Sequence, residues 1–401
     1  MRKLITFFTL FFSFFLCSQE PLFTLLDESK TGIDFSNDLV DTEEHSIFLY
    51  ANYYGGAGVG IGDFDNDGLE DIFLAANLLD DKIYKNLGNL KFEDKTKMSG
   101  IINNGSWSTG VTVADVNNDG LLDIYVSCEL YDDLPILRTN KLYINKGNFK
   151  FKESAEDWGV DVDRRTRHSV FFDFNNDGLL DLYLLNHPPN TGNFSPFFGT
   201  DMTLPEYNLQ LFENKGNHFE DVTESAGLDR SGFPNAAVIG DFNKDGWPDI
   251  YVANDFDAPD FLYFNNKDGS FTYKTETSLR HTSFYSMGVD AADINNDSHL
   301  DLMVLDMTAE DNFRLKSNMS GMNPDSFWSV VNGGGHYQYM FNTLQINNGN
   351  NTFSDIAQLT GTAATDWSWA SLVADFDNDG NKDIYITNGP VSYTHLTLPT
   401  R

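Results

Sequence analysis

Six copies of one nine-residue segment recur along the chain, with Asp and Asn at fixed spacing. In every copy positions 1, 3 and 5 are Asp or Asn and position 9 is Asp, while position 6 is Gly in five copies. A tight loop would bring these side-chain oxygens and the carbonyl of position 7 around one point, and glycine permits the sharp turn. Oxygen ligands without His or Cys argue against zinc and copper, and Mg²⁺ prefers to keep its waters. Each copy is therefore a predicted calcium loop.

The candidate metal ligands are the residues at positions 1, 3, 5 and 9, which allow up to six Ca²⁺ sites. In chain order they are Asp63, Asp65, Asp67, Asp71, Asp115, Asn117, Asp119, Asp123, Asp173, Asn175, Asp177, Asp181, Asp241, Asn243, Asp245, Asp249, Asp293, Asn295, Asp297, Asp301, Asp375, Asp377, Asp379 and Asp383. The first and sixth loops carry four Asp side chains, so we expect them to bind Ca²⁺ most tightly. Ser298 replaces the loop glycine in the fifth copy, which leaves that site in doubt.

Two other interpretations of the loops were weighed. An EF-hand opens with the same spacing, but it needs Glu at position 12 and a helix on each side. Position 12 is Leu, Val or Ile here and lies in a predicted strand, so the EF-hand is excluded. A plain turn explains one Asp-Asn-Asp-Gly segment, but it does not explain six copies that all end in Asp.

The residues around each loop predict the elements that position it. Apolar stretches such as 110–114 precede the loops, and segments rich in branched and aromatic residues follow, so each loop joins two strands of a hairpin. A second turn and a Phe-led strand come next, which gives about four strands per repeat. The loops start 52 to 82 residues apart, a spacing that suits propeller blades. We predict an all-β fold, a β-propeller of six to seven four-stranded blades.

The two ends of the chain have different predicted roles. Basic residues precede an apolar run of about a dozen residues, too short to span a bilayer, so residues 1–18 are a predicted signal peptide, with Cys17 as a possible lipid anchor. Residues 391–401 resemble a translated sequencing adapter and are set apart as a non-native tail. The propeller then occupies residues 19–390, and we expect the natural protein to continue beyond it. Residues 23–33 resemble an outer strand and are expected to complete the last blade through main-chain pairing.

Charge and cysteine content exclude several classes of protein. The net charge of −34 argues against direct binding of nucleic acid. Two cysteines, Cys17 and Cys128, cannot form a disulfide scaffold. No further stretch is apolar enough to cross a membrane. The expected location is therefore outside the cell, either secreted or on the cell surface, with an outer-membrane lipoprotein as the alternative.

The repeats resemble the FG-GAP, or VCBS, repeats of integrin α-subunit propellers, and within them the bacterial proteins similar to cartilage acidic protein. The resemblance runs from about Phe23 to Gly389 and includes the six loops and the segments 306–314 and 365–369. It implies a seven-bladed propeller, calcium in the loops, export, and a role in binding or adhesion. The chain departs from this pattern at Ser298 and in having no seventh loop, so six and seven blades both stay open.

Two long insertions are the candidate working surfaces, because a rigid ring commonly carries its function on loops. One spans about 186–207 and includes Phe194, Phe197 and Phe198. The other spans about 308–341, and its candidate ligand-binding residues are Arg314, Trp328, His336, Tyr337 and Tyr339. Exposed aromatics could bind a glycan or a protein partner; the alternative is that they pack between blades.

Catalytic motifs find little support in the sequence. The His residues have no linked nucleophile, and the glycines of 55–62 precede a calcium loop rather than a helix. We therefore expect a binding or adhesion module for a protein or glycan and not an enzyme. The alternative is a propeller that acts as a polysaccharide hydrolase or lyase, which a group of Arg, Tyr and His side chains in one cleft would favour.

Overall fold

The computed structural model describes residues 22–50, 52–131, 133–188, 204–256, 258–318 and 324–389. The predicted signal peptide, Cys17, the adapter-like tail, and Phe194, Phe197 and Phe198 all lie outside the described residues. Within them, no helix has the length and apolar character needed to span a bilayer.

Five of the six repeats form complete four-stranded antiparallel sheets. Their strands are β1 (Val59–Gly62), β2 (Asp71–Leu74), β3 (Lys82–Asn86) and β4 (Phe92–Asp94); β5 (Trp107–Ala114), β6 (Asp123–Glu129), β7 (Lys141–Asn145) and β8 (Phe151–Glu153); β9 (Arg165–Phe172), β10 (Asp181–His187), β11 (Gln210–Asn214) and β12 (Phe219–Asp221); β13 (Pro234–Gly240), β14 (Asp249–Asn254), β15 (Phe261–Asn265) and β16 (Phe271–Tyr273); β18 (Val289–Ala292), β19 (Asp301–Val304), β22 (Thr343–Asn347) and β23 (Phe353–Asp355).

The sixth sheet has three strands among the described residues, β20 (Met307–Thr308), β24 (Asp366–Ala374) and β25 (Asp383–Asn388), and β17 (Thr282–Ser283) pairs in parallel with β21 (Gln338–Tyr339). One-turn helices follow four outer strands: α2 (Thr96–Ser99), α4 (Ala155–Trp158), α5 (Thr275–Ser278) and α8 (Ala357–Thr360); a similar one-turn helix, α1 (Glu28–Thr31), precedes β1. The others are α3 (Pro135–Arg138), η1 (Pro205–Tyr207), α6 (Asn312–Asn318) and α7 (Pro324–Asn332).

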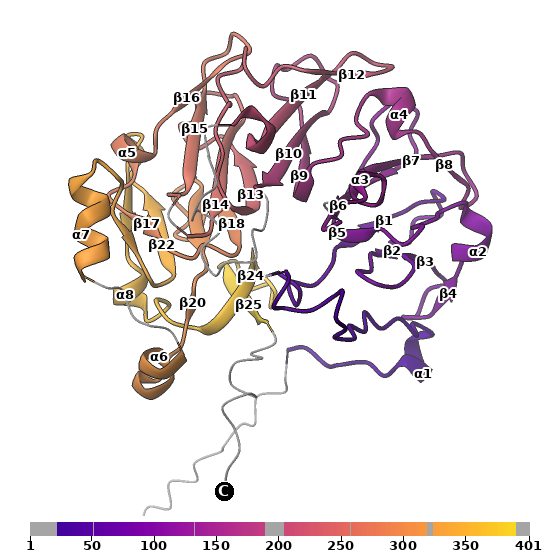
Figure 1. Ribbon diagram of the computed structural model, residues 1–401, viewed down its shortest axis with the longest axis horizontal. Helices are drawn as coiled ribbons and strands as arrows, with labels where there is room; N and C mark the ends of the chain where they lie inside the picture. The colour runs from indigo at the N-terminus through magenta and orange to yellow at the C-terminus, as the bar shows by residue number, and fades with distance from the viewer. Residues whose placement is uncertain are drawn as a thin grey trace, which may run out of the picture.

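The sheets lie side by side around a centre, with the first strand of each blade innermost and the fourth at the rim (Figure 1). This is the predicted β-propeller, with six blade sheets in the described part of the chain. Blades two to five are covered on both faces by their neighbours, so their second strands are buried on both faces rather than on alternate residues. Strand β6, for example, is buried at all seven positions. Cys128 lies in it as a buried core residue, as expected.

The hairpins close as the repeat predicts. Gly62 pairs with Asp71 across the first loop, and Ala114 pairs with Asp123 across the second. Position 9 is therefore the first residue of each second strand, and the preceding eight residues form the turn. The loops of all six repeats stand at the same end of their blades, since each joins a first strand to a second.

In blades two to five a buried asparagine ends the third strand and fastens that blade to the one before it. Nδ2 of Asn145 donates to the Phe64 carbonyl of the first blade over 2.9 Å and to its own blade at the Leu122 carbonyl over 3.0 Å. The same bond to the preceding blade recurs three times, from Asn214 to Val116, from Asn265 to Phe174, and from Asn347 to Phe242. The sequence analysis took these asparagines for turn residues only.

The N-terminal segment bridges the last and first blades, as predicted. The ring of Phe23 packs edge-on against Phe376 and Tyr385 of the sixth blade, with ring centroids 5.5 and 5.3 Å apart. At the other end of the segment, Gly32 has φ +82° and abuts the Phe92 carbonyl of β4, where a Cβ would come within 2.6 Å. These contacts place the segment between the two blades that meet where the ring closes.

The predicted main-chain pairing of this segment is wrong. Residues 23–33 form a loop and the one-turn helix α1 instead of a strand. Asp27 caps the helix by accepting a 2.8 Å hydrogen bond from the Ser29 amide, and Gly32 ends it in the left-handed conformation. The sequence Asp-Glu-Ser-Lys-Thr-Gly therefore satisfies its own backbone locally, and the segment contacts the sixth blade through Phe23, whose side chain stays 54% exposed.

Replacing Asn214 with Ala should destabilise the protein by about 1–3 kcal/mol, because the buried Val116 and Leu180 carbonyls would each lose a donor. Thermal or denaturant unfolding measures the change. Asn86→Ala is the matched control, since Asn86 occupies the same turn but its Nδ2 bonds only within its own blade, to the Glu70 carbonyl. Equal losses in the two variants would contradict a special role for the bond between blades.

Candidate calcium loops and ligand-binding surface

All six loops have one conformation, set by the carboxylate of position 1. In the first loop, the two carboxylate oxygens of Asp63 accept hydrogen bonds from the amides of Asp67, at 3.0 Å, and Gly68, at 2.7 Å. The corresponding pair of bonds recurs at Asp115, Asp173, Asp241, Asp293 and Asp375. The backbone is thereby wrapped around the position-1 side chain, which is the turn the glycine was predicted to permit.

The position-9 carboxylate joins each loop to the third strand of its blade. In the second blade, Asp123 accepts a 3.1 Å bond from the Val116 amide in the loop and a 2.7 Å bond from the Asn145 amide in β7. The same two bonds recur at Asp71, Asp181, Asp249 and Asp301. Burial raises the pKa of this carboxyl, to about 6 in Asp71 and to about 7 in Asp123, Asp181 and Asp249.

The side chains fit a hard cation. In the first loop, carboxylate oxygens of Asp63, Asp65 and Asp71 lie within 4.8 Å of one another, and Asp375, Asp377 and Asp383 converge in the same way in the sixth. A set of oxygen donors around one point, with Asn in place of Asp at position 3 of the middle loops, is what Ca²⁺ takes. Bound Ca²⁺ would supply the positive charge that these close, like-charged groups otherwise lack.

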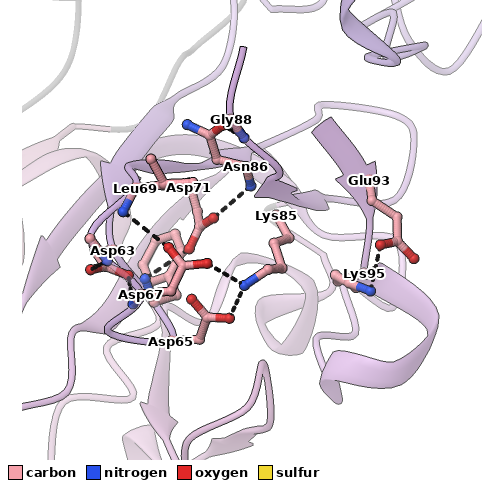
Figure 2. A network of polar contacts seen from close by, with 12 residues as sticks. Asp63, Asp65, Asp67, Leu69, Asp71, Lys85, Asn86, Gly88, Glu93 and Lys95 are labelled. Atoms are coloured by element: carbon pink, nitrogen blue, oxygen red, sulfur yellow. Dashed lines mark hydrogen bonds and ion pairs between the residues drawn. The ribbon is translucent and has the colours of Figure 1, made fainter. Parts of the chain in front are cut away.

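The first and sixth loops differ in a way the sequence analysis missed. Lys85, at the end of β3, extends its ammonium group between Asp65 and Asp67 and bonds to both, at 2.6 Å in the case of Asp67 (Figure 2). No described lysine or arginine makes such a contact with the side chains of the sixth loop. A Ca²⁺ ion in the first loop must therefore compete with Lys85, so among the two loops of four Asp side chains the sixth is now expected to bind more tightly.

The fifth loop carries the strain expected of Ser298. This residue has φ +68°, in the left-handed region where the other five loops place glycine at φ +84° to +89°. Its amide still donates to Asp293, at 2.7 Å, so the loop keeps its shape. His299 adds a second departure, because its Nδ1 lies 3.1 Å from an Asp297 carboxylate oxygen that is a candidate ligand.

The insertion between β19 and β22 carries the five candidate ligand-binding residues, which the structure separates into two groups. Tyr337 and His336 line a pocket at the rim, and Trp328 stands on α7 with 52% of its surface exposed. Tyr339 is stacked between Phe327 and Phe341 and so serves the packing of the insertion.

Arg314 is engaged in the structure rather than open to a ligand. It lies on α6, where its guanidinium bonds to Asp311 and, at 2.6 Å, to Asp366 at the start of β24. These ion pairs fasten α6 to the sixth blade, apart from the residues of the pocket.

A buried polar group lies where the second strands of blades two and three end, opposite the loops, and the sequence analysis did not find it. Glu129 accepts a short hydrogen bond from the Tyr50 hydroxyl and lies 3.2 Å from Nδ1 of His187 and 3.8 Å from the Arg167 guanidinium. Burial opposes ionisation of Glu129, but the charges of His187 and Arg167 hold its pKa below the usual range. Arg167 also donates to the Gly55 carbonyl at 3.0 Å, so this buried group anchors the residues just before β1.

The fold and the loops define a class of protein: a repeat β-propeller whose blade hairpins present oxygen-rich loops. A model of the FG-GAP-like repeat matches residues 63–126, 198–252, 241–304 and 323–386, which together make up more than half of the chain. The chain belongs to the FG-GAP-like repeat family. This confirms the resemblance drawn from the loops.

Among curated proteins, the chain is similar to phosphatidylinositol-glycan-specific phospholipase D of Bos taurus, with 29% identity over 150 residues. The match covers 33% of this chain and 17% of that protein, so the chain spans only about a sixth of the relative's length.

Three solved structures are similar over much of the chain. An Agrocybe aegerita lectin that recognises non-reducing terminal N-acetylglucosamine has TM-score 0.46 and 17% identity, covering 81% of this chain and 73% of that one. The V. cholerae biofilm matrix protein Bap1 has TM-score 0.37 and 12% identity, covering 75% and 38%. A family-43 β-1,3-galactosidase has TM-score 0.32 and 11% identity, covering 62% and 85%. At these TM-scores no ligand or activity is carried over from them.

Replacing Lys85 with Met should tighten calcium binding at the first loop. Removing a competing ammonium that is largely sequestered by two carboxylates is worth about 1 kcal/mol, or roughly fivefold in Kd. The variant should also lose stability in chelator, because Asp65 and Asp67 lose the ammonium that pairs with them, which has no described cationic substitute. Calorimetric calcium titration with thermal melts tests both effects. Lys152→Met, which breaks a pair with Asp157 outside the loops, is the control; an unchanged titration in Lys85→Met would contradict the competition.

Replacing Ser298 with Gly should stabilise the fold by about 0.5–1 kcal/mol, since it removes a left-handed non-glycine residue and keeps the amide bond to Asp293. The reciprocal variant, Gly178→Ser, should destabilise it by a similar amount, because nothing lies within 4 Å of the position its Cβ would take and only the backbone conformation is penalised. Denaturant midpoints measure both. A loss of stability in Ser298→Gly would show that the serine side chain has a role of its own.

Proposed function

We propose that this chain is an exported, calcium-binding β-propeller that acts as a binding or adhesion module for an extracellular glycan or protein. The observation that carries the proposal is the division of the molecule into two kinds of surface. The loops at one end of the blades share one backbone conformation and gather oxygen ligands, while the insertion between β19 and β22 presents exposed aromatic side chains.

The aromatic surface has the character of a binding site. Phe313, Trp328 and Tyr337 are 79%, 52% and 41% exposed, although all three belong to a single insertion. Large aromatic side chains left in contact with water are disfavoured unless a partner covers them, and aromatic anchors dominate binding energies at interfaces. The ring beneath them is held by buried strands, so these side chains are presented on a rigid support.

Calcium supports this role by stabilising the ring. The six loops keep carboxylates close together in a chain without a disulfide framework. Ca²⁺ bound only by the folded state would stabilise that state by mass action. The weak affinities typical of extracellular calcium modules, with Kd about 10⁻⁴ to 10⁻³ M, would keep the sites filled outside a cell and empty inside it. Export and calcium binding are therefore consistent parts of one proposal.

The second candidate is a polysaccharide hydrolase or lyase, for which the group of Glu129, Arg167, His187 and Tyr50 is the relevant observation. An Arg, a Tyr, a His and a carboxylate do converge. However, all four side chains are buried and most of their polar atoms bond to one another or to the N-terminal segment. Their geometry favours an anchoring role, and FG-GAP repeats by themselves indicate a binding module.

Removing calcium should lower both the melting temperature and the binding of the protein to cell surfaces. A site filled at ten times its Kd adds about 1.4 kcal/mol, so several filled sites would shift the midpoint by many degrees. Differential scanning calorimetry with millimolar calcium or excess chelator measures stability, and labelled protein applied to glycan arrays and intact cells measures binding. Magnesium at the same concentration is the control. Identical melts in calcium and chelator would overturn the calcium part of the proposal; absence of binding to any array or cell would overturn the adhesion part.

A further inference from the structure

A pocket of about 470 Å³ opens at the rim between blades four and five. Its floor is apolar, formed by the buried side chains of Leu279 and Phe353. Its volume lies within the range of about 300–1,000 Å³ typical of small-molecule sites. Three elements surround it: the helix α5 with the residues that follow, the insertion, and the turn between β22 and β23. Polar and aromatic side chains line the rest of the pocket, among them Glu276, Arg280, His336, Tyr337, Asn348 and Thr352.

The residue before the Phe of the outer strand differs among the blades. In blade two it is Lys150, which donates its ammonium to the Met98 carbonyl in α2 of the preceding blade. In blade one it is Lys91, which contacts the Ser29 carbonyl in α1 at 3.4 Å. In blades three, four and five it is His218, Ser270 and Thr352. At the junction of blades four and five, Thr352 lines the pocket beside α5 in place of a lysine.

The polar groups around the pocket are available to a ligand. Glu276 and Arg280 lie four residues apart, but no hydrogen bond or ion pair joins either of them to another described residue. Nε2 of His336 is buried and also has no hydrogen-bond partner among the described residues. The amide of Asn348 donates to the Thr352 and Ser354 hydroxyls, each at 3.1 Å, so it is engaged within the turn that forms this wall of the pocket. One carboxylate, one guanidinium and one imidazole thus line the pocket with unused hydrogen-bonding capacity among the described residues.

An aromatic ring completes the pocket, and its position is fixed. Tyr337 is 41% exposed, while its carbonyl accepts a 3.0 Å bond from the Thr282 amide at the start of the β17–β21 pair. The ring of Phe327 on α7 lies 6.1 Å from that of Tyr337, and Trp328 lies against Phe327 with centroids 5.1 Å apart. The aromatic surface therefore continues from the pocket onto α7, and little ordering is needed on binding.

We propose that this pocket binds a neutral hexopyranose unit of a glycan. A pyranose ring has an apolar face that can lie on Tyr337 and hydroxyls around its edge that can donate to Glu276 and accept from Arg280. The net charge of −34 and the carboxylate of Glu276 disfavour an anionic sugar. The chain of a polymeric glycan would run toward Trp328. This inference rests on the proposed binding function and assigns its ligand class and its site.

Two variants test the site by opposite means. Tyr337→Ala removes the stacking surface, and Thr352→Lys places at this junction the residue that spans the equivalent space at blades one and two. Both should weaken binding at least tenfold while leaving the melting temperature and the calcium titration close to those of the parent. Phe48→Ala is the control, because Phe48 is an exposed aromatic, 81% exposed, that lies outside the insertion and does not line the pocket; it should bind like the parent.

The probes are methyl glycosides and linear tetrasaccharides of glucose, galactose and mannose, measured by calorimetry with the full chain in millimolar calcium. Binding of at least one probe that is lost in Tyr337→Ala and Thr352→Lys and kept in Phe48→Ala would support the inference. Binding that survives in both pocket variants would overturn the site and leave the proposed function standing. If the chain binds cells through a protein and binds no neutral sugar, the proposed ligand class is overturned and the proposed function still stands. Failure to bind any glycan or cell would overturn the proposed function itself.

Discussion

The structure depends on a buried carboxylate held by two backbone amides. The Asp at position 9 accepts one hydrogen bond from the loop that precedes it and one from the end of the third strand, as Asp181 does from Phe174 and Asn214. A charged group with almost no exposure is costly unless it is paired or hydrogen-bonded. These bonds make the carboxylate tolerable, and they also fix the loop against the sheet. In five of the six copies Asp at this position therefore has a structural role in addition to being a candidate calcium ligand.

The same residue positions link neighbouring blades. The asparagine whose amide bonds to the position-9 carboxylate uses its side chain to reach the carbonyl of position 2 in the preceding blade, as Asn214 reaches Val116. Loops are also joined directly, since Asn66 donates to the Gly120 carbonyl of the next loop at 2.9 Å. Side-chain hydrogen bonds at the loop end thus link each of blades two to five to the blade before it.

The sequence was sufficient to predict the loops, the hairpins and the propeller, because the same pattern of residues recurs six times and each copy supports the interpretation of the others. It was not sufficient for features that depend on contacts between repeats. Asn145 looks like an ordinary turn residue, and only its neighbour blade gives it a second role. Lys85 is 18 residues from Asp67, and nothing in the chain order shows that its ammonium enters the first loop. The N-terminal segment was assigned to the correct junction, but its capped helical turn was mistaken for a strand.

The rim pocket and the buried group around Glu129 show how one ring can divide anchoring from binding. Near the ends of β6 and β10, Glu129 accepts a hydrogen bond from Tyr50, and Arg167 donates one to the Gly55 carbonyl. Both charged groups therefore hold residues that precede β1. At the rim, Glu276 and Arg280 have comparable chemistry but no partner in the described chain, and a pocket lies beside them. Charged groups satisfied within the fold contribute to its uniqueness, whereas unsatisfied ones that border a rigid aromatic cavity are suited to recognition. The position of Thr352 is occupied by lysine in the first two blades, where the ammonium contacts the preceding helix, and by other residues in the next three, so a single substitution there changes what lies beside that helix.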